Sequence, residues 1–242
     1  MSSFVAASVL DSFSGAIDFI FNQREAATGG VQVGGLDQVL ELTWKHVQVS
    51  AAALGIGLAI ALPAGLILGH RGRGEGLAIA VGNAGRAIPE LALIAFVIAF
   101  VGVGFLNVTL ALAVLAIPPI LTNTFVAVSQ VDRNTVEAAR GVGMTELEVV
   151  RKVELRLAAP TIMTGIRTAA INVIATAAIA PLAGVTTLGD FILARNVYGD
   201  EGVLAGAILI ATLAIVVELV LAGIQRLVTP RGVELQRAAV TA

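Results

Sequence analysis

Long blocks without charge alternate with short polar runs along this chain. Five of these blocks are long enough for a helix that crosses a bilayer, which takes about 20 residues. The blocks cover residues 47–69, 77–103, 106–128, 161–183 and 203–227. The second is interrupted by Arg86, Pro89 and Glu90, and the last two contain Arg167 and Glu218. The pattern predicts five membrane-spanning helices.

The composition indicates an all-α integral membrane protein. Of the 242 residues, 57% are hydrophobic and 13% are charged, whereas about 25% charged residues is typical of soluble domains. The net charge of −2 offers no basic surface for nucleic acid. The absence of cysteine excludes disulfides and metal sites built on thiolates. A soluble enzyme and a nucleic-acid-binding protein are therefore poor fits.

The N-terminal segment, residues 1–46, differs from these blocks. Residues 4–21 are apolar, but they contain Asp11 and Asp18, and no basic residues precede them as in a signal peptide. Apolar side chains recur at helical spacing, namely Phe13, Ile17, Ile20 and Phe21. We expect an amphipathic helix at the membrane interface, with a sixth span as the alternative. A flexible link is expected next, marked by Gly29, Gly30, Gly34 and Gly35.

The basic residues predict the orientation in the membrane. With five spans, ten of the 15 Lys and Arg residues fall on one side, three on the other and two inside spans. The side rich in basic residues faces the cytoplasm by the positive-inside rule. This predicts an N-terminus outside and a cytoplasmic tail at residues 229–242. The polar loop at residues 129–156 is then cytoplasmic.

This polar loop carries signals for two short helices. Asn134 with Glu137 three positions later is typical of an N-cap with an acidic partner. A helix that begins there can end at Gly141 or Gly143, because glycine accepts the left-handed conformation of a helix end.

A second capping box, formed by Thr145 and Glu148, predicts another helix that runs toward Arg156. From the residues alone, a solvated connection explains this helix pair as well as a functional element does. A DNA-binding helix-turn-helix is disfavoured by the few basic residues and the flanking spans.

The loop resembles the EAA signature of ABC-importer permeases. Glu137-Ala138-Ala139 is followed after three residues by Gly143, and after nine more by Val153-Glu154-Leu155. Val153 stands where the signature has Ile, and Arg156 where it has Pro. Further stretches are similar to the osmoprotectant branch, the permeases for glycine betaine, choline, carnitine and proline. These stretches are residues 44–50, 87–92, 165–169 and 188–192 within a likeness that covers residues 38–235.

The resemblance implies a type I ABC-importer permease domain at residues 47–228, located in the bacterial inner membrane, with a cytoplasmic coupling helix in the loop. It implies that Glu137 makes charged contacts with a cytoplasmic ATPase. Ala138 and Ala139 would then allow close approach, and Gly141 and Gly143 would set the turn. The implied partners are a second permease chain, an ABC ATPase dimer and an extracytoplasmic solute-binding protein.

The chain is expected to bind no cofactor and to be a transport subunit rather than an enzyme. It lacks the GxxxxGK[S/T] phosphate loop, so ATP is expected to bind to a partner. No catalytic constellation is visible, and a metal site at His46 or His70 is disfavoured because no second histidine is near either of them in the sequence. With one Trp and one Tyr, a quaternary ammonium cage is expected in the binding protein.

Four ionisable residues inside the predicted spans are candidates for the pathway or for intramembrane ion pairs, because such groups are costly in lipid. Arg86 and Glu90 are four positions apart, so they can pair or line a gate. Arg167 either extends to the interface or pairs with Glu218.

Two alternatives to an osmoprotectant importer remain at this point. A permease for methionine or another amino acid shares the five-span plan. A nucleotide-independent secondary transporter belongs to a different class, but it would leave the coupling loop unexplained, and no inverted repeat is visible.

Overall fold

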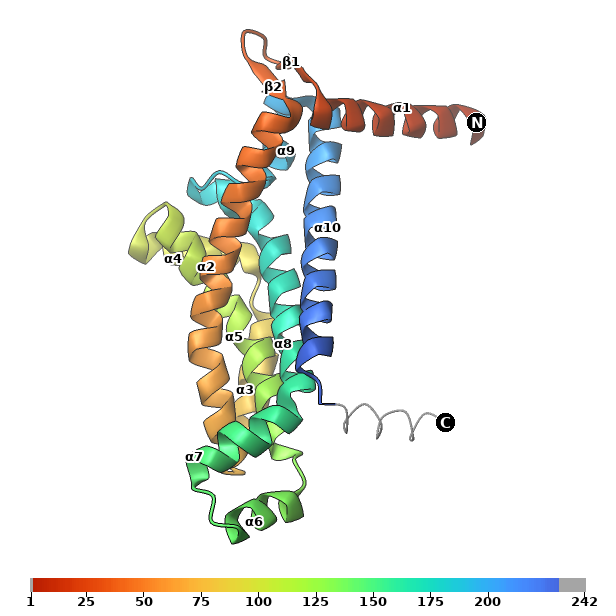
Figure 1. The fold of residues 1–242 in the computed structure, drawn as a ribbon. Helices are drawn as coiled ribbons and strands as arrows, with labels where there is room; N and C mark the ends of the chain where they lie inside the picture. Colours follow the sequence, from red (N-terminus) through yellow and green to blue (C-terminus); the bar gives the residue numbers. More distant parts are fainter. Residues whose placement is uncertain (1, 231–242) are drawn as a thin grey trace. The chain divides into compact units, whose positions relative to one another are not determined.

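The computed structural model describes residues 2–230, and it describes the side chains of this range except those of residues 2–10 and 86. The chain is almost entirely helical, with one small hairpin (Figure 1). The predicted tail at residues 229–242 therefore lies largely outside the described residues.

The elements follow one another in the order in which Figure 1 labels them. They are α1 (Ser2–Phe21), β1 (Gln23–Glu25), β2 (Gln32–Gly34), α2 (Gly35–His70), α3 (Glu75–Ala87), α4 (Glu90–Val101), α5 (Phe105–Ser129), α6 (Arg133–Gly141), α7 (Glu146–Glu148), the π-helix η1 (Val149–Glu154), α8 (Leu155–Thr176), the 3₁₀ helix η2 (Ala177–Ala183), α9 (Gly189–Leu193) and α10 (Arg195–Val228).

Within the described residues, four helical segments are long and apolar enough to cross a membrane. They are Gly35–His70, Phe105–Ser129, Glu146–Ala183 and Arg195–Val228. A fifth span results if α3 and α4 together form one broken span. The break lies at Ile88 and Pro89, since proline removes a backbone donor and disfavours helix at the residue before it. The predicted interruption of the second block is thus a real break in the helix.

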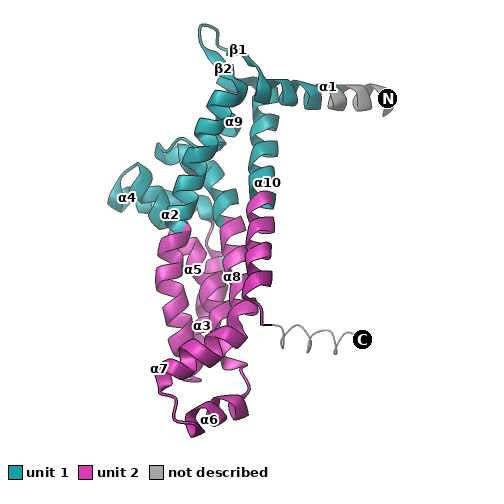
Figure 2. Cartoon of the chain, in the orientation of Figure 1, with its two compact units in different colours: residues 1–53, 90–112, 173–215 teal, residues 54–89, 113–172, 216–242 magenta. Residues whose placement is uncertain are grey.

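The chain divides into two compact units (Figure 2). Unit 1 contains residues 1–53, 90–112 and 173–215, and unit 2 contains residues 54–89, 113–172 and 216–242. Helices α2, α5, α8 and α10 contribute residues to both units.

In unit 2, α2 and α5 pack closely because small residues recur every fourth position along α2. Gly57, Ala61, Gly65 and Gly69 form this ladder. A Cβ atom built at Gly65 would lie 2.7 Å from the Cβ of Thr124 and 3.0 Å from the carbonyl oxygen of Leu121. Small residues allow such approach between membrane helices, where van der Waals packing replaces the hydrophobic driving force.

Two further helices of unit 2 also approach α5 at glycines. A Cβ at Gly85 of α3 would lie 2.3 Å from Pro118, and one at Gly165 of α8 would lie 2.7 Å from the carbonyl oxygen of Pro119. Helix α5 is therefore the helix against which α2, α3 and α8 are packed. Consistent with this, 61% of its apolar window is buried, compared with 6% for α10.

In unit 1, the expected flexible link is a hairpin instead. Strands β1 and β2 pair antiparallel, with Arg24 opposite Val33. Gly29, Gly30, Gly34 and Gly35 all have φ between 76° and 80°, a left-handed conformation that glycine adopts without steric cost. The glycines therefore specify a turn and the start of α2.

Helix α1 runs crosswise to the start of α2 in unit 1 (Figure 1), which is the course that an interfacial helix needs. Phe13, Ile17 and Phe21 form an exposed stripe with a spacing of four residues, whereas Ala16 and Phe19 are fully buried. The interfacial location itself stays a prediction.

Three aromatic rings hold α1 in place. Phe191 lies 5.1 Å from Phe19 and 5.0 Å from Tyr198 between ring centroids, both edge to face. Nearby, Thr187 donates to the carbonyl oxygen of Ala177 over 3.0 Å. These contacts fix α9 against η2 and the start of α10.

The glycine ladder generates a direct test. Gly65→Ala places a methyl group against Thr124, so we expect it to lower the free energy of unfolding by about 1–3 kcal/mol. Gly55→Ala is the matched control on the same helix, because nothing lies within 4 Å of its Cβ position. Thermal unfolding in detergent measures both. Equal midpoints for the two variants would show that α2 and α5 are not packed this closely.

Candidate coupling interface

The cytoplasmic loop predicted from the sequence is a small folded element of unit 2 with its own apolar core. Val136 and Ala139 of α6 are buried together with Val149 of η1. Met144 and Val153 pack against this cluster. Because the core joins both halves of the loop, the loop is a compact structure rather than a plain connection.

The predicted N-cap of the first helix is wrong by two residues. Helix α6 begins after Asp132, whose carboxylate accepts a 3.2 Å hydrogen bond from the backbone N–H of Asn134. The hydroxyl of Thr135 donates to the same carboxylate over 3.1 Å. Asp132 caps the helix because its two oxygens serve both donors, which leaves Glu137 without a capping role.

The end of α6 is a Schellman motif centred on Gly143. The N–H of Met144 donates to the carbonyl of Ala139, and the N–H of Gly143 donates to the carbonyl of Arg140. Gly143 has φ +90°, whereas Gly141 has no positive φ and is the last helical residue. Gly143 therefore makes the turn, and the contact of Met144 with the loop core completes the motif.

The second helix begins with the predicted capping box. The Thr145 side chain accepts from the Glu148 backbone, and the Glu148 side chain accepts from the Thr145 backbone. The helical segment Glu146–Ala183 has 38 residues, or about 57 Å. Its charged start thus extends beyond a hydrocarbon core of about 30 Å.

Ion pairs join the loop's elements. The Arg140 guanidinium donates to both carboxylate oxygens of Glu146 over 3.0 and 2.9 Å. These bonds raise the pKa of Arg140 and lower that of Glu146 from their ordinary values. Hydrogen bonds from Lys152 and from Thr145 lower the pKa of Glu148 to about 2. All three groups are therefore charged at neutral pH.

The residues of the EAA signature do not all face the same way. Glu137 and Ala138 are exposed, and Glu137 makes no hydrogen bond or ion pair among the described residues. Ala139 is buried in the loop core. Its small size serves the packing of α6 on η1, so only Glu137 and Ala138 of this triplet are free to contact a partner.

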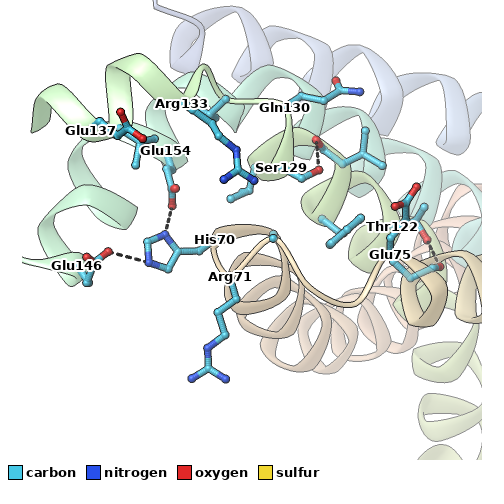
Figure 3. Close-up of a pocket in the computed structure, with 18 of the residues that line it drawn as sticks. His70, Arg71, Glu75, Thr122, Ser129, Gln130, Arg133, Glu137, Glu146 and Glu154 are labelled. Carbon is cyan, nitrogen blue, oxygen red and sulfur yellow. Dashed lines mark hydrogen bonds and ion pairs between the residues drawn. The ribbon is translucent and has the colours of Figure 1, made fainter. Parts of the chain in front are cut away.

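A cavity of about 720 Å³ lies between the loop and the helix ends of unit 2 (Figure 3). His70 at the end of α2 lines it together with Glu146 and Glu154 of the loop. No local sequence pattern predicts the contact between His70 and Glu154, because the two residues are 84 positions apart in the chain.

Of the four ionisable residues predicted inside the spans, Arg167 and Glu218 form an ion pair. Arg167 donates to the carboxylate of Glu218 and to the amide oxygen of Gln225, and Gln225 donates to the carbonyl of Pro160 over 2.6 Å. Of the two alternatives for Arg167, the structure has the pair with Glu218. The side chain of Arg86 lies outside the described residues, so its pairing with Glu90 stays a prediction.

The family of binding-protein-dependent transport system inner membrane components matches residues 61–232. The chain belongs to this family. It is 39% identical over 198 residues to the choline transport system permease protein OpuBB of Bacillus subtilis (strain 168), over 81% of this chain and 91% of that protein. It is also 39% identical over 196 residues to the carnitine transport permease protein OpuCB of Listeria monocytogenes, over 81% and 90% respectively.

Solved structures share the fold. An inward-facing conformation of the MetNI methionine ABC transporter matches with a TM-score of 0.69 and 23% identity, over 81% of this chain and 98% of that chain. An amino acid ABC transporter with histidines matches with a TM-score of 0.60 and 18% identity, over 78% and 94% respectively. The predicted permease fold is confirmed.

Family membership also establishes the role of the chain. It is a membrane-spanning permease subunit of a transport system that depends on a binding protein.

The Schellman turn predicts unequal roles for the two loop glycines. We expect Gly143→Ala to destabilise α6 by about 1–2 kcal/mol, because alanine is strained at φ +90°. Gly141→Ala is the matched control, since its backbone is helical and its Cβ position is open. Hydrogen exchange of the α6 amides reports the difference. Equal protection in the two variants would contradict the turn.

Proposed function

We propose that this chain forms the translocation pathway of an importer for osmoprotectants such as glycine betaine, choline, carnitine or proline. The support is the identity of 38–39% to permeases named for choline, carnitine and glycine betaine. The match to the methionine transporter has 23% identity and supports the fold alone.

The main recognition of the solute belongs to a separate binding protein in this proposal. Quaternary ammonium groups bind over open aromatic faces. Tyr198 packs edge to face on Phe191, which is fully buried, and Trp44 is 63% exposed on the side of α2. Tyr198, the single tyrosine, therefore supports the packing of α1 and α9 rather than lining a cage.

The loop at residues 129–156 couples the chain to a cytoplasmic ATPase dimer in this proposal. The single observation that carries this role is Glu137, an exposed and unpaired carboxylate on a helix that is capped at both ends and packed on its own core. A rigid helix with a free charge can transmit motion from a bound partner. ATP binds to that partner, and this chain needs no cofactor of its own.

The complete importer in this proposal contains a second permease chain, identical or related, and an extracytoplasmic binding protein. The N-terminus faces outward and the C-terminus faces the cytoplasm, because ten of the 15 basic residues then lie inside. Arg167 and Glu218 hold α8 and α10 together.

Solute uptake into vesicles tests the proposed function. The vesicles hold this chain, its co-encoded ATPase and its binding protein, and they are offered labelled choline, carnitine, glycine betaine, proline and methionine with and without ATP. We expect uptake of at least one of the first four that requires ATP. Uptake without nucleotide would identify a secondary transporter, and uptake of methionine alone would favour the amino-acid alternative.

Glu137→Lys in the same vesicles tests the loop. Reversing this charge places a cation where the partner is expected to carry one, so uptake should fall at least tenfold, which corresponds to about 1.4 kcal/mol. Glu75→Lys is the matched control, because Glu75 is also exposed and unpaired among the described residues but lies outside the loop. Equal uptake by the two variants would contradict the coupling role.

A further inference from the structure

His70 sits between two carboxylates that belong to the second half of the loop (Figure 3). Its Nδ1 lies 2.8 Å from an oxygen of Glu154, and its Nε2 lies 3.1 Å from an oxygen of Glu146. The imidazole is the last side chain of α2 and is 17% exposed.

Glu154 needs this partner. It is 4% exposed, and a buried carboxylate is costly unless it is paired and hydrogen-bonded. In the described part of the chain, His70 is the only residue whose side chain forms a hydrogen bond with the Glu154 carboxylate. Glu154 is on the π-helix η1, a type of helix that occurs often at functional sites.

The contact continues to the helix that carries Glu137. Glu146 binds both His70 and Arg140, and Arg140 is on α6. A continuous line of charge-assisted bonds thus runs from η1 through the end of α2 to α6. In the chain, His70 is separated from the loop by α3, α4 and α5, so these bonds connect it to the loop directly.

Each ring nitrogen of His70 has a carboxylate oxygen within hydrogen-bond distance. A neutral imidazole donates from one nitrogen only, whereas the imidazolium donates from both. Only the imidazolium can therefore donate to Glu146 and Glu154 at once. The other charged residues that line the same cavity are Arg71, Glu75, Arg133, Glu137 and Arg140.

We propose that His70 is a positioning residue for coupling, which bridges Glu146 and Glu154 and holds the loop at the end of α2. The proposal rests on the proposed coupling role of the loop. Motion of α6 then reaches α2 as well as the two spans that the loop joins covalently, α5 and α8.

The experiment measures solute carried per ATP hydrolysed in vesicles that hold the complete importer. We expect His70→Leu to lower this ratio about fivefold, within the usual range of coupling between sites. His70→Arg should restore the ratio, because a guanidinium can donate to both carboxylates. Arg73→Leu is the control, since Arg73 is exposed at the same helix end and does not line the cavity.

The remaining outcomes also decide the question. A His70→Leu ratio equal to that of wild type, or a ratio that His70→Arg fails to restore, overturns the positioning role. Suppose that Glu137→Lys stops uptake in the same vesicles. A negative result with the His70 variants then overturns the role of His70 alone, and the coupling role of the loop stands. If Glu137→Lys has no effect, the coupling role of the loop is contradicted, and this proposal is overturned with it.

Discussion

Close approach of helices at small residues is the constraint on which the rest of this structure depends. In lipid there is little hydrophobic force between helices, so packing distance decides which helices stay together. Helix α5 receives α2, α3 and α8 at glycines whose Cβ positions are occupied by neighbouring atoms. A charged side chain inside these apolar helices needs a partner, because an unpaired charge is costly in lipid. Arg167 and Glu218 lie in a pair, and most other charges lie at the ends of the apolar blocks.

The loop outside the apolar blocks is built for stiffness in a different way. It uses an aspartate cap, a glycine turn, a capping box and a core centred on Val149. These devices satisfy the backbone groups at the helix ends that an irregular loop would leave to water. Glu137 on α6 is exposed and makes no hydrogen bond or ion pair among the described residues. A stiff element with such an exposed charge is suited to receive motion from a partner.

Much of this organisation could be predicted from the sequence, because the relevant signals are local. Uncharged blocks predicted the spans, and the Thr145–Glu148 box predicted the second helix of the loop. Local signals were ambiguous where two residues suit one role, as when Asp132 rather than Asn134 caps α6. They also could not show that Ala139 faces inward, or that four glycines near the N-terminus form a hairpin. The contact of His70 with Glu154 joins residues 84 positions apart, and no periodicity encodes it.

Cross-linking from the loop to the ATPase tests the central claim most directly. The chain contains no cysteine, so Ala138→Cys introduces a single thiol on the exposed side of α6, and Thr28→Cys introduces one on the hairpin as a control. In the assembled importer, a short thiol-directed photo-cross-linker should join the ATPase to the chain through position 138 and not through position 28. A copurifying ATPase that is never linked through position 138 would contradict the account.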